Sequence, residues 1–264
     1  MAVAGIDMGA LATKVVILEG DRILAATTLM TGETGETEAH KAMEEALRQA
    51  GLKLEEIKSV ISTGTGRKRV PFAQKQRTAM SCHAQGAYFL FPQVRTVIDV
   101  GAESSAAIRL SADGKIEDSV GNDKCAAGTG IFLDAMSRML RVSLGEMGAE
   151  SLKATGTVPI SSMCVIFAES EVVSHVHKDP PIPCANILAG IHDSIVDRLF
   201  GMAQRVGMEP EVVMTGGVSK NVGIIRAMES KLGTKVLVPE DPQIVGALGA
   251  ALFAQQENGI RESC

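Results

Sequence analysis

Two Asp-x-Gly motifs occupy the same place in a repeated stretch of the sequence. Shifting the chain by 92 residues lays Asp7 on Asp99 and Gly9 on Gly101. Each motif is followed by a polar tip, an apolar run, a turn and a second run, which is the pattern of a β-hairpin with an acid at its mouth. Glycine turns bind phosphate through backbone amides, and paired aspartates hold hydrated Mg²⁺ and orient a water molecule. The repeat therefore indicates a phosphate-and-metal site.

Two further glycine turns have the pattern of a loop that opens a helix. One contains Gly128, Thr129 and Gly130, and the other follows an apolar run and contains Gly216 and Gly217. After the second of these turns we expect a helix capped by Ser219, a residue type that favours helix N-termini. Such junctions collect free backbone N–H groups and attract anions. A single Asp-x-Gly or glycine turn would still be read as an ordinary strand end, because short motifs match by chance.

The duplicated hairpins imply two similar α/β lobes facing one another. We expect an N-terminal lobe over 1–94 and a C-terminal lobe over 95–264, the latter with a helical insertion. Apolar residues within the insertion recur at spacings of three and four and mark the buried face of one long helix: Leu188, Ile191, Ile195, Leu199, Met202 and Val206. The last predicted helix, 244–256, is rich in small residues that suit close backbone approach, and it is a candidate to pack back on the N-terminal lobe.

Composition excludes several classes of protein. The chain has 264 residues, 45% of them hydrophobic, with a formal charge of −5 and only 3% aromatic residues. It lacks the basic runs and stacking residues of a nucleic-acid-binding protein. It also lacks an apolar run of about 20 residues that could span a bilayer, and Asp7 falls where a signal peptide would be apolar. We expect a cytoplasmic protein with no membrane partner, whose five widely spaced cysteines form no disulfide framework.

The motifs together carry a family resemblance. GIDMG, DVGAESS, NDKCAAGTG, SSMCVIFAESEV and TGGVSKN occur in this order over nearly the whole chain. This set resembles the ATP-binding activators of 2-hydroxyacyl-CoA dehydratases and the ATPase subunits of benzoyl-CoA reductase. The resemblance implies the fold of the acetate and sugar kinase, heat-shock chaperone and actin superfamily, in which duplicated ribonuclease H-like lobes bind ATP in the cleft between them. It also implies one 4Fe–4S cluster shared by two subunits.

The resemblance assigns roles to single residues. The cluster ligands fall on Cys125 and Cys164, which the residues alone would have us read as buried structural thiols. Asp7 and Asp99 would organise Mg²⁺ and the attacking water. The residues implied to contact ATP or ADP are Gly9, Thr13, Lys14, Gly101, Gly128, Thr129, Gly130, Gly216 and Gly217.

The second phosphate turn departs from the family pattern. Where the family usually has Gly-Gln-Asp-Ser-Lys, residues 102–106 read AESSA, so the Gln, Asp and Lys are missing. We therefore expect slow hydrolysis by this chain alone, and favour one ATPase subunit of an unequal pair, as in benzoyl-CoA reductase. The alternative is a homodimeric activator of a 2-hydroxyacyl-CoA dehydratase. Either would take electrons from reduced ferredoxin or flavodoxin and pass them to catalytic acyl-CoA subunits. A small-molecule kinase and a non-catalytic nucleotide-binding regulatory subunit are more distant alternatives.

Overall fold

The computed structural model describes residues 1–32, 35–122 and 129–259. Contacts divide the chain into two compact units. Unit 1 consists of Met1–Val94, Leu110–Ile116 and Pro239–Cys264, and unit 2 of Arg95–Arg109 and Glu117–Val238. Unit 1 thus joins both ends of the chain, and the lobe boundaries 1–94 and 95–264 stay a sequence-based prediction. In the described ranges, no helix combines the length and the apolar character needed to cross a membrane.

Unit 1 is built on a five-stranded sheet with the order β3-β2-β1-β4-β5. β1 pairs antiparallel with β2 and parallel with β4. The strands are β1 (Val3–Met8), β2 (Ala12–Glu19), β3 (Arg22–Met30), β4 (Val60–Thr63) and β5 (Lys75–Gln76), and the helices are α1 (Glu36–Ala50), α2 (Ala79–Leu90) and α8 (Val245–Glu257). Short 3-10 helices span Leu54–Glu56 and Arg67–Arg69.

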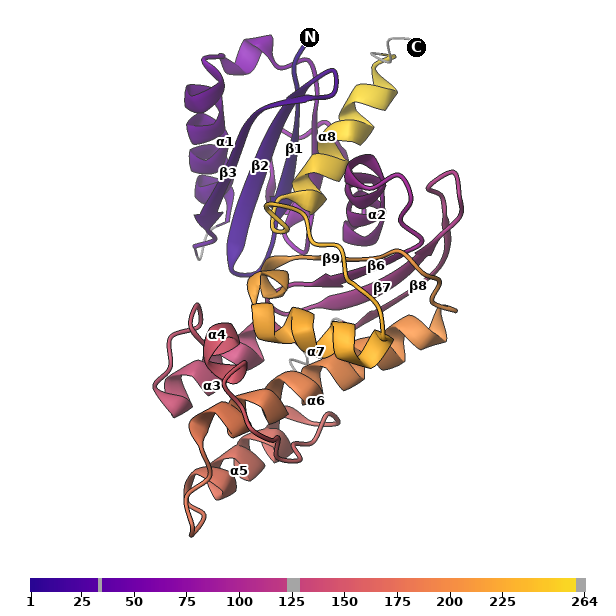
Figure 1. Ribbon diagram of the computed structural model, residues 1–264. Helices are drawn as coiled ribbons and strands as arrows, with labels where there is room; N and C mark the ends of the chain where they lie inside the picture. The colour runs from indigo at the N-terminus through magenta and orange to yellow at the C-terminus, as the bar shows by residue number, and fades with distance from the viewer. Residues whose placement is uncertain (33–34, 123–128, 260–264) are drawn as a thin grey trace. The chain divides into compact units, whose positions relative to one another are not determined.

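Both faces of this sheet are covered, which is why every residue of β1 is buried. Successive strand residues point to opposite faces. Ile6 and Met8 pack with buried residues of α1 such as Met43, whereas Val3 packs with α8 residues such as Leu248. In Figure 1 the yellow helix α8 runs beside β1, and the purple helix α1 lies next to β3. The first Asp-x-Gly motif therefore begins in a strand that is covered on both faces.

The small residues of α8 let it approach its neighbours closely. A Cβ added to Gly5 of β1 would lie 2.0 Å from the carbonyl oxygen of Ala247. A Cβ on Gly249 would lie 1.8 Å from the carbonyl oxygen of Cys82 on α2. Because real Cβ atoms do not reach backbone atoms at such distances, glycine is required at both positions. These contacts hold α8 against β1, the strand that contains Asp7, and hold α2 against α8.

Unit 2 contains a four-stranded sheet with the order β8-β7-β6-β9, in which β6 pairs antiparallel with β7 and parallel with β9. The strands are β6 (Thr96–Val100), β7 (Ser105–Leu110), β8 (Ile116–Asn122) and β9 (Val212–Thr215). The helices are α3 (Gly130–Leu140), α4 (Met147–Ser151), α5 (Val165–Val176), α6 (Cys184–Arg205) and α7 (Val222–Leu232), and a 3-10 helix spans Gly217–Lys220.

The long helix predicted in the insertion is α6. All six residues of its predicted apolar stripe are buried, and they pack with residues of α3, α7 and the sheet in one core. Figure 1 shows α6 in orange passing under α7, with α5 alongside. The expected N-cap of α7 is wrong by two residues. Ser219 lies in the 3-10 helix, and the Asn221 side chain caps α7 by accepting hydrogen bonds from the amides of Gly223 and Ile224.

Candidate functional site

In unit 1 the first motif places a carboxylate at the end of a buried strand. Asp7 lies opposite Lys14 in the β1–β2 register, and Lys14 Nζ donates to Asp7 Oδ2 at 3.1 Å. The amide of Gly9 closes the turn on the Ala12 carbonyl at 3.0 Å. The structure thus brings three predicted site residues together, Asp7, Gly9 and Lys14. The fourth, Thr13, is buried, and its hydroxyl shares a hydrogen bond with Thr31.

A second turn, not recognised in the sequence, wraps the same carboxylate. β4 runs parallel to β1, and Thr63 lies opposite Asp7. Gly64 follows with φ +86°, and a Cβ there would lie 2.4 Å from both Asp7 Oδ1 and the Met8 carbonyl oxygen. Only glycine combines this left-handed backbone with so close an approach. The turn after β4 is therefore shaped around Asp7.

Unit 2 repeats this arrangement around Asp99. Thr215 at the end of β9 lies opposite Asp99 of the parallel strand β6, and its Oγ1 donates to Asp99 Oδ1 at 3.0 Å. Gly216 follows, again with φ +86°, and a Cβ there would lie 2.3 Å from the Val100 carbonyl oxygen and 2.8 Å from Asp99 Oδ1. Each unit thus has an Asp facing a Thr-Gly turn across two parallel strands. We call each set the Asp–Thr–Gly cradle: Asp7, Thr63 and Gly64 in unit 1, and Asp99, Thr215 and Gly216 in unit 2.

The start of α3 contacts the turn that follows Asp99 in unit 2. Gly130 donates its amide to the Gly101 carbonyl at 2.9 Å, and Ile131 donates to the Ala102 carbonyl at 3.0 Å. A Cβ on Gly130 would also touch Val218 at 3.5 Å. The turns at Gly101, Gly130 and Gly216–Gly217 therefore converge within unit 2, with the buried Thr129 as N-cap of α3. Two of the helix's first amides bond protein carbonyls, and Gly128 lies outside the described residues.

Cys82 and His83 of α2 lie near the cradle of unit 1. Burial raises the pKa of the Cys82 thiol to about 12, with the charge of Asp7 acting in the same direction. A thiol with this pKa stays protonated at neutral pH and is a poor nucleophile. His83 is buried beside Gly246 of α8, where a Cβ would lie 2.8 Å from His83 Nε2 and 3.3 Å from Asp7 Oδ2. Both residues therefore lie close to the Asp7 carboxylate.

Cys164, the predicted cluster ligand that the structure describes, is the N-cap residue of α5. Its thiol is half-buried and forms no disulfide. Large apolar side chains beside it are unusually exposed, with Met163 83%, Ile166 68% and Phe167 63% accessible. Such a patch is typical of a surface covered by another protein. Cys125, the other predicted ligand, lies outside the described residues, and the described ones contain no group of three or more His, Cys, Asp or Glu residues able to hold a metal ion.

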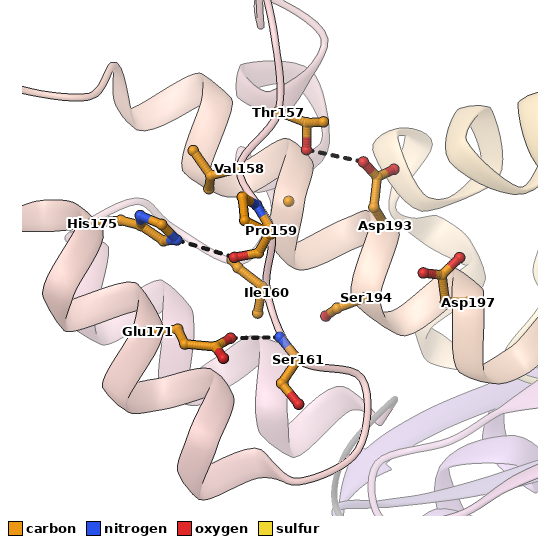
Figure 2. Close-up of a pocket in the computed structure, with 11 residues that line it drawn as sticks. Thr157, Val158, Pro159, Ile160, Ser161, Glu171, His175, Asp193, Ser194 and Asp197 are labelled. Carbon is orange, nitrogen blue, oxygen red and sulfur yellow. Dashed lines mark hydrogen bonds between the residues drawn. The ribbon is translucent and has the colours of Figure 1, made fainter.

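The segment 155–163, which leads to Cys164 and which we call the strap, is fastened to α5 and α6. Thr157 Oγ1 donates to Asp193 at 3.0 Å, His175 Nε2 lies 3.0 Å from the Pro159 carbonyl oxygen, and the Ser161 amide donates to Glu171 at 2.5 Å. Figure 2 shows these three contacts. Residues of the strap, α5 and α6 line a cavity of about 730 Å³. Three of the side chains that line the cavity are already hydrogen-bonded to the strap. We therefore interpret the cavity as space left between the strap and the helices, and not as a ligand pocket.

The end of the strap is held by Arg198 of α6. Its guanidinium donates to the Ser162 carbonyl at 3.2 Å and to the Met163 carbonyl at 3.5 Å, directly before Cys164. Gly190 of α6 allows the close approach of the strap, since a Cβ there would lie 2.3 Å from the Val158 carbonyl oxygen. No pattern in the sequence predicts these contacts, because the side chains and the strap are separated by many residues.

Comparisons with known proteins match this geometry over almost the whole chain. The activator of lactoyl-CoA dehydratase from Anaerotignum propionicum is 46% identical, covering 97% of this chain and 98% of the relative. The activator of the 2-hydroxyisocaproyl-CoA dehydratase from Clostridium difficile, solved with bound ADPNP, has a TM-score of 0.90 at 40% identity and covers 100% of this chain and 99% of its own. A benzoyl-CoA reductase subunit from Thauera aromatica is less similar, with 34% identity over 95% of this chain and 92% of its own.

A sugar kinase shares the fold alone. The ROK hexokinase from Thermus thermophilus has a TM-score of 0.54 at 15% identity, covering 99% of this chain and 100% of its own. The expected α/β fold class with duplicated ribonuclease H-like lobes is confirmed. The model of the BadF/BadG/BcrA/BcrD ATPase family matches residues 4–254. The resemblance found in the motifs is thereby confirmed: this chain belongs to the BadF/BadG/BcrA/BcrD ATPase family.

Proposed function

We propose that this chain is the ATP-hydrolysing activator of a 2-hydroxyacyl-CoA dehydratase, to which it delivers an electron. The duplicated Asp–Thr–Gly cradle supports a nucleotide-hydrolysing site. The relatives bear on the choice between the two interpretations of the sequence, because the activators of dehydratases are more similar to this chain than the benzoyl-CoA reductase subunit. They favour the activator, which was our alternative, over one member of an unequal pair.

In this proposal the two cradles act on the nucleotide. Asp7 and Asp99 are buried carboxylates, the oxygen ligands that Mg²⁺ prefers. When bound, Mg²⁺ would neutralise charge on the transferred phosphoryl group. Asp7 and Asp99 would also orient the attacking water, and Lys14, which donates to Asp7, would contact phosphate. The glycine turns at Gly9, Gly101 and Gly216 contribute backbone amides.

Cys164 and Cys125 would hold a 4Fe–4S cluster together with the same two residues of a second subunit. Cys164 fits this role because its thiol is free and half-buried on an exposed apolar surface that a second subunit would cover. When bound, the cluster would carry one electron at low potential, received from reduced ferredoxin or flavodoxin. The strap, clasped by Glu171 and Arg198, fixes the backbone that presents the Cys164 thiol.

ATP couples to electron delivery if it binds the conformation that engages the dehydratase more tightly than the resting one, since a ligand shifts an equilibrium only by its differential affinity. One observation still favours an unequal pair: residues 102–106 lack the polar side chains usual in the second phosphate turn. In that case a second ATPase subunit would supply the faster site.

One anaerobic experiment separates these possibilities. The purified wild-type protein should hold about four iron atoms per dimer. Alone, with ATP and a strong reductant, it should activate a 2-hydroxyacyl-CoA dehydratase. The Cys125→Ser and Cys164→Ser variants should lose the iron and keep nucleotide binding, whereas Cys184→Ser, a matched half-buried cysteine, should keep both. Full iron content in both ligand variants would refute the cluster assignment. Activation only after adding a second, different ATPase subunit would favour the unequal pair.

A further inference from the structure

A buried histidine of unit 2 connects three helices beside the third glycine turn. His192 of α6 is 1% exposed. Its Nε2 lies 3.2 Å from Asn221 Nδ2, and its Nδ1 lies 3.0 Å from Ser151 Oγ at the end of α4. Asn221 is the N-cap of α7 and directly follows the 3-10 helix Gly217–Lys220. The imidazole therefore links α6 to both α4 and the start of α7.

The hydrogen-bond partners of His192 fix the direction of each hydrogen bond in this network. Asn221 Oδ1 accepts from the amides of Gly223 at 2.9 Å and Ile224 at 3.2 Å, so the Asn221 NH₂ group faces the histidine. His192 Nε2 must then accept, which leaves the proton on Nδ1 to be donated to Ser151 Oγ. Ser151 in turn donates to the Gly148 carbonyl at 2.7 Å. The network assigns one tautomer, neutral with the proton on Nδ1.

The surroundings leave no room for another arrangement. A Cβ on Gly223 would lie 2.2 Å from Ser151 Oγ and 2.6 Å from His192 Nδ1, and a Cβ on Gly148 would lie 2.6 Å from Asn221 Oδ1. Two glycines are thus needed where the helices meet the imidazole. Burial lowers the pKa of His192 to about 4, so the ring is neutral at physiological pH. A neutral, single-tautomer ring is what an acceptor for Asn221 requires.

The network continues through the third turn to the cradle of unit 2. The Asn221 amide donates to the Val218 carbonyl at 3.0 Å, and Ser219 Oγ donates to the Thr215 carbonyl at 2.8 Å. Thr215 in turn donates to Asp99. The turn Gly216–Gly217 is therefore held at one end by the cradle and at the other by Asn221. The side-chain NH₂ group of Asn221 in turn donates to His192.

We propose that His192 is a positioning residue for nucleotide binding: by accepting from Asn221, it fixes the turn Gly216–Gly217 in the conformation that receives the nucleotide. This inference rests on the proposed role of that turn in ATP binding. The competing explanation is a histidine that only fills the core. The two differ because positioning requires the Nε2 acceptor specifically, whereas filling the core requires only volume.

Two substitutions separate the two nitrogens. In His192→Gln the amide oxygen can take the place of Nε2 and accept from Asn221. In His192→Asn the shorter amide can replace only Nδ1, so the bond to Ser151 is retained and the bond to Asn221 is lost. We expect His192→Asn to weaken binding of Mg-ADPNP roughly tenfold, the value of one buried hydrogen bond, and His192→Gln to stay within about twofold. His177→Asn, on the exposed C-cap of α5, is the matched control.

Calorimetry with Mg-ADPNP on the full-length protein measures the effect, and thermal unfolding of the same samples reports the structural cost. Equal weakening in the Gln and Asn variants, or wild-type affinity in both, would overturn the positioning role of His192 and leave the proposed function intact. Failure of the wild type to bind Mg-ADPNP would instead refute nucleotide binding itself.

If the variants do not fold, the inference can be tested on the wild-type protein. Nitrogen-15 NMR of labelled histidines should show His192 with its proton on Nδ1 and should show its Nε2 resonance move when Mg-ADPNP saturates the protein. A proton on Nε2, or no movement at saturation, would overturn the inference.

Discussion

The two cradles share their residue types and backbone conformation and differ in the contacts of their carboxylates. In both, an Asp faces a Thr across parallel strands, and the next residue is a glycine with φ +86° that could not carry a Cβ. The antiparallel neighbour differs: Asp7 lies opposite Lys14, whereas Asp99 lies opposite Ala106. Asp7 forms an ion pair, and Asp99 accepts from the hydroxyl of Thr215. The comparison indicates that the backbone cradle is the common requirement, while the residue opposite the Asp on the antiparallel strand, Lys14 or Ala106, differs between the units.

The largest effect is expected from neutralising the carboxylates. Asp7→Asn should reduce Mg-dependent ATP turnover by about 10²–10³-fold, because it removes an anionic ligand and leaves the half-buried Lys14 without its partner. Asp99→Asn should reduce ATP turnover by a smaller factor, since the Thr215 hydroxyl can still donate a hydrogen bond to the oxygen of an amide. Steady-state turnover together with calorimetry of Mg-ADPNP measures rate and affinity separately. Equal losses in both variants, or lost affinity with unchanged turnover, would contradict a division of roles between the cradles.

The cradle glycines test what the two units have in common. Gly64→Ala and Gly216→Ala should each destabilise the protein by about 2–4 kcal/mol, because a left-handed backbone and a collision with a carbonyl oxygen add together. Thermal unfolding is the measurement. Gly51→Ala and Gly233→Ala are matched controls, since both have positive φ but nothing within 4 Å of the added Cβ. Cradle variants no worse than these controls would show that the close approach is dispensable.

The pH dependence of stability should distinguish a buried group of unit 2, His192, from a buried group of unit 1, Cys82. The pKa of His192 in unit 2 falls from 6.5 to about 4, so between these values the unfolded chain binds a proton that the native protein does not. This contribution leaves stability constant above pH 6.5 and lowers it as pH falls toward 4, by about 1.4 kcal/mol per pH unit. In unit 1, Cys82 stays protonated throughout, because its pKa is about 12.

Urea unfolding between pH 7 and 4.5 checks this expectation, with His192→Gln as the reference that removes the titrating group. The wild type should lose more stability than the variant over this range. Parallel curves for the two proteins would show that His192 is protonated in the native state as readily as in the unfolded chain.

The smallest effect is expected from the cradle threonines. Thr215→Val removes the hydroxyl that donates to Asp99 and should cost about 2 kcal/mol, because this hydrogen bond is buried and its acceptor is charged. Thr63→Val should leave stability unchanged or raise it slightly, since the buried Thr63 hydroxyl has no hydrogen-bond partner among the described residues. Chemical denaturation gives both values. A larger loss in Thr63→Val would mean that the two cradles are more alike than their contacts indicate.

Much of the local structure followed from short-range patterns. The repeated Asp-x-Gly motif, the turn after Thr215 and the buried stripe of α6 were all predicted. The cap of α7 was placed on Ser219 because serine favours that position, yet the structure uses Asn221, since the turn first continues as a 3-10 helix. Local propensity specified the type of element better than its boundary.

The sequence by itself determined the duplicated hairpins, the glycine turns and the family, because these depend on residue types a few positions apart. Only the tertiary structure decided that Thr63-Gly64 is the counterpart of Thr215-Gly216, that Arg198 and Glu171 hold the strap, and that His192 supports the cap of α7. Parallel strand pairing and helix packing join residues far apart in the chain, and neither leaves a periodic signal at those positions. The partners of a buried polar group are set by which distant elements fold against it, and those contacts define the site.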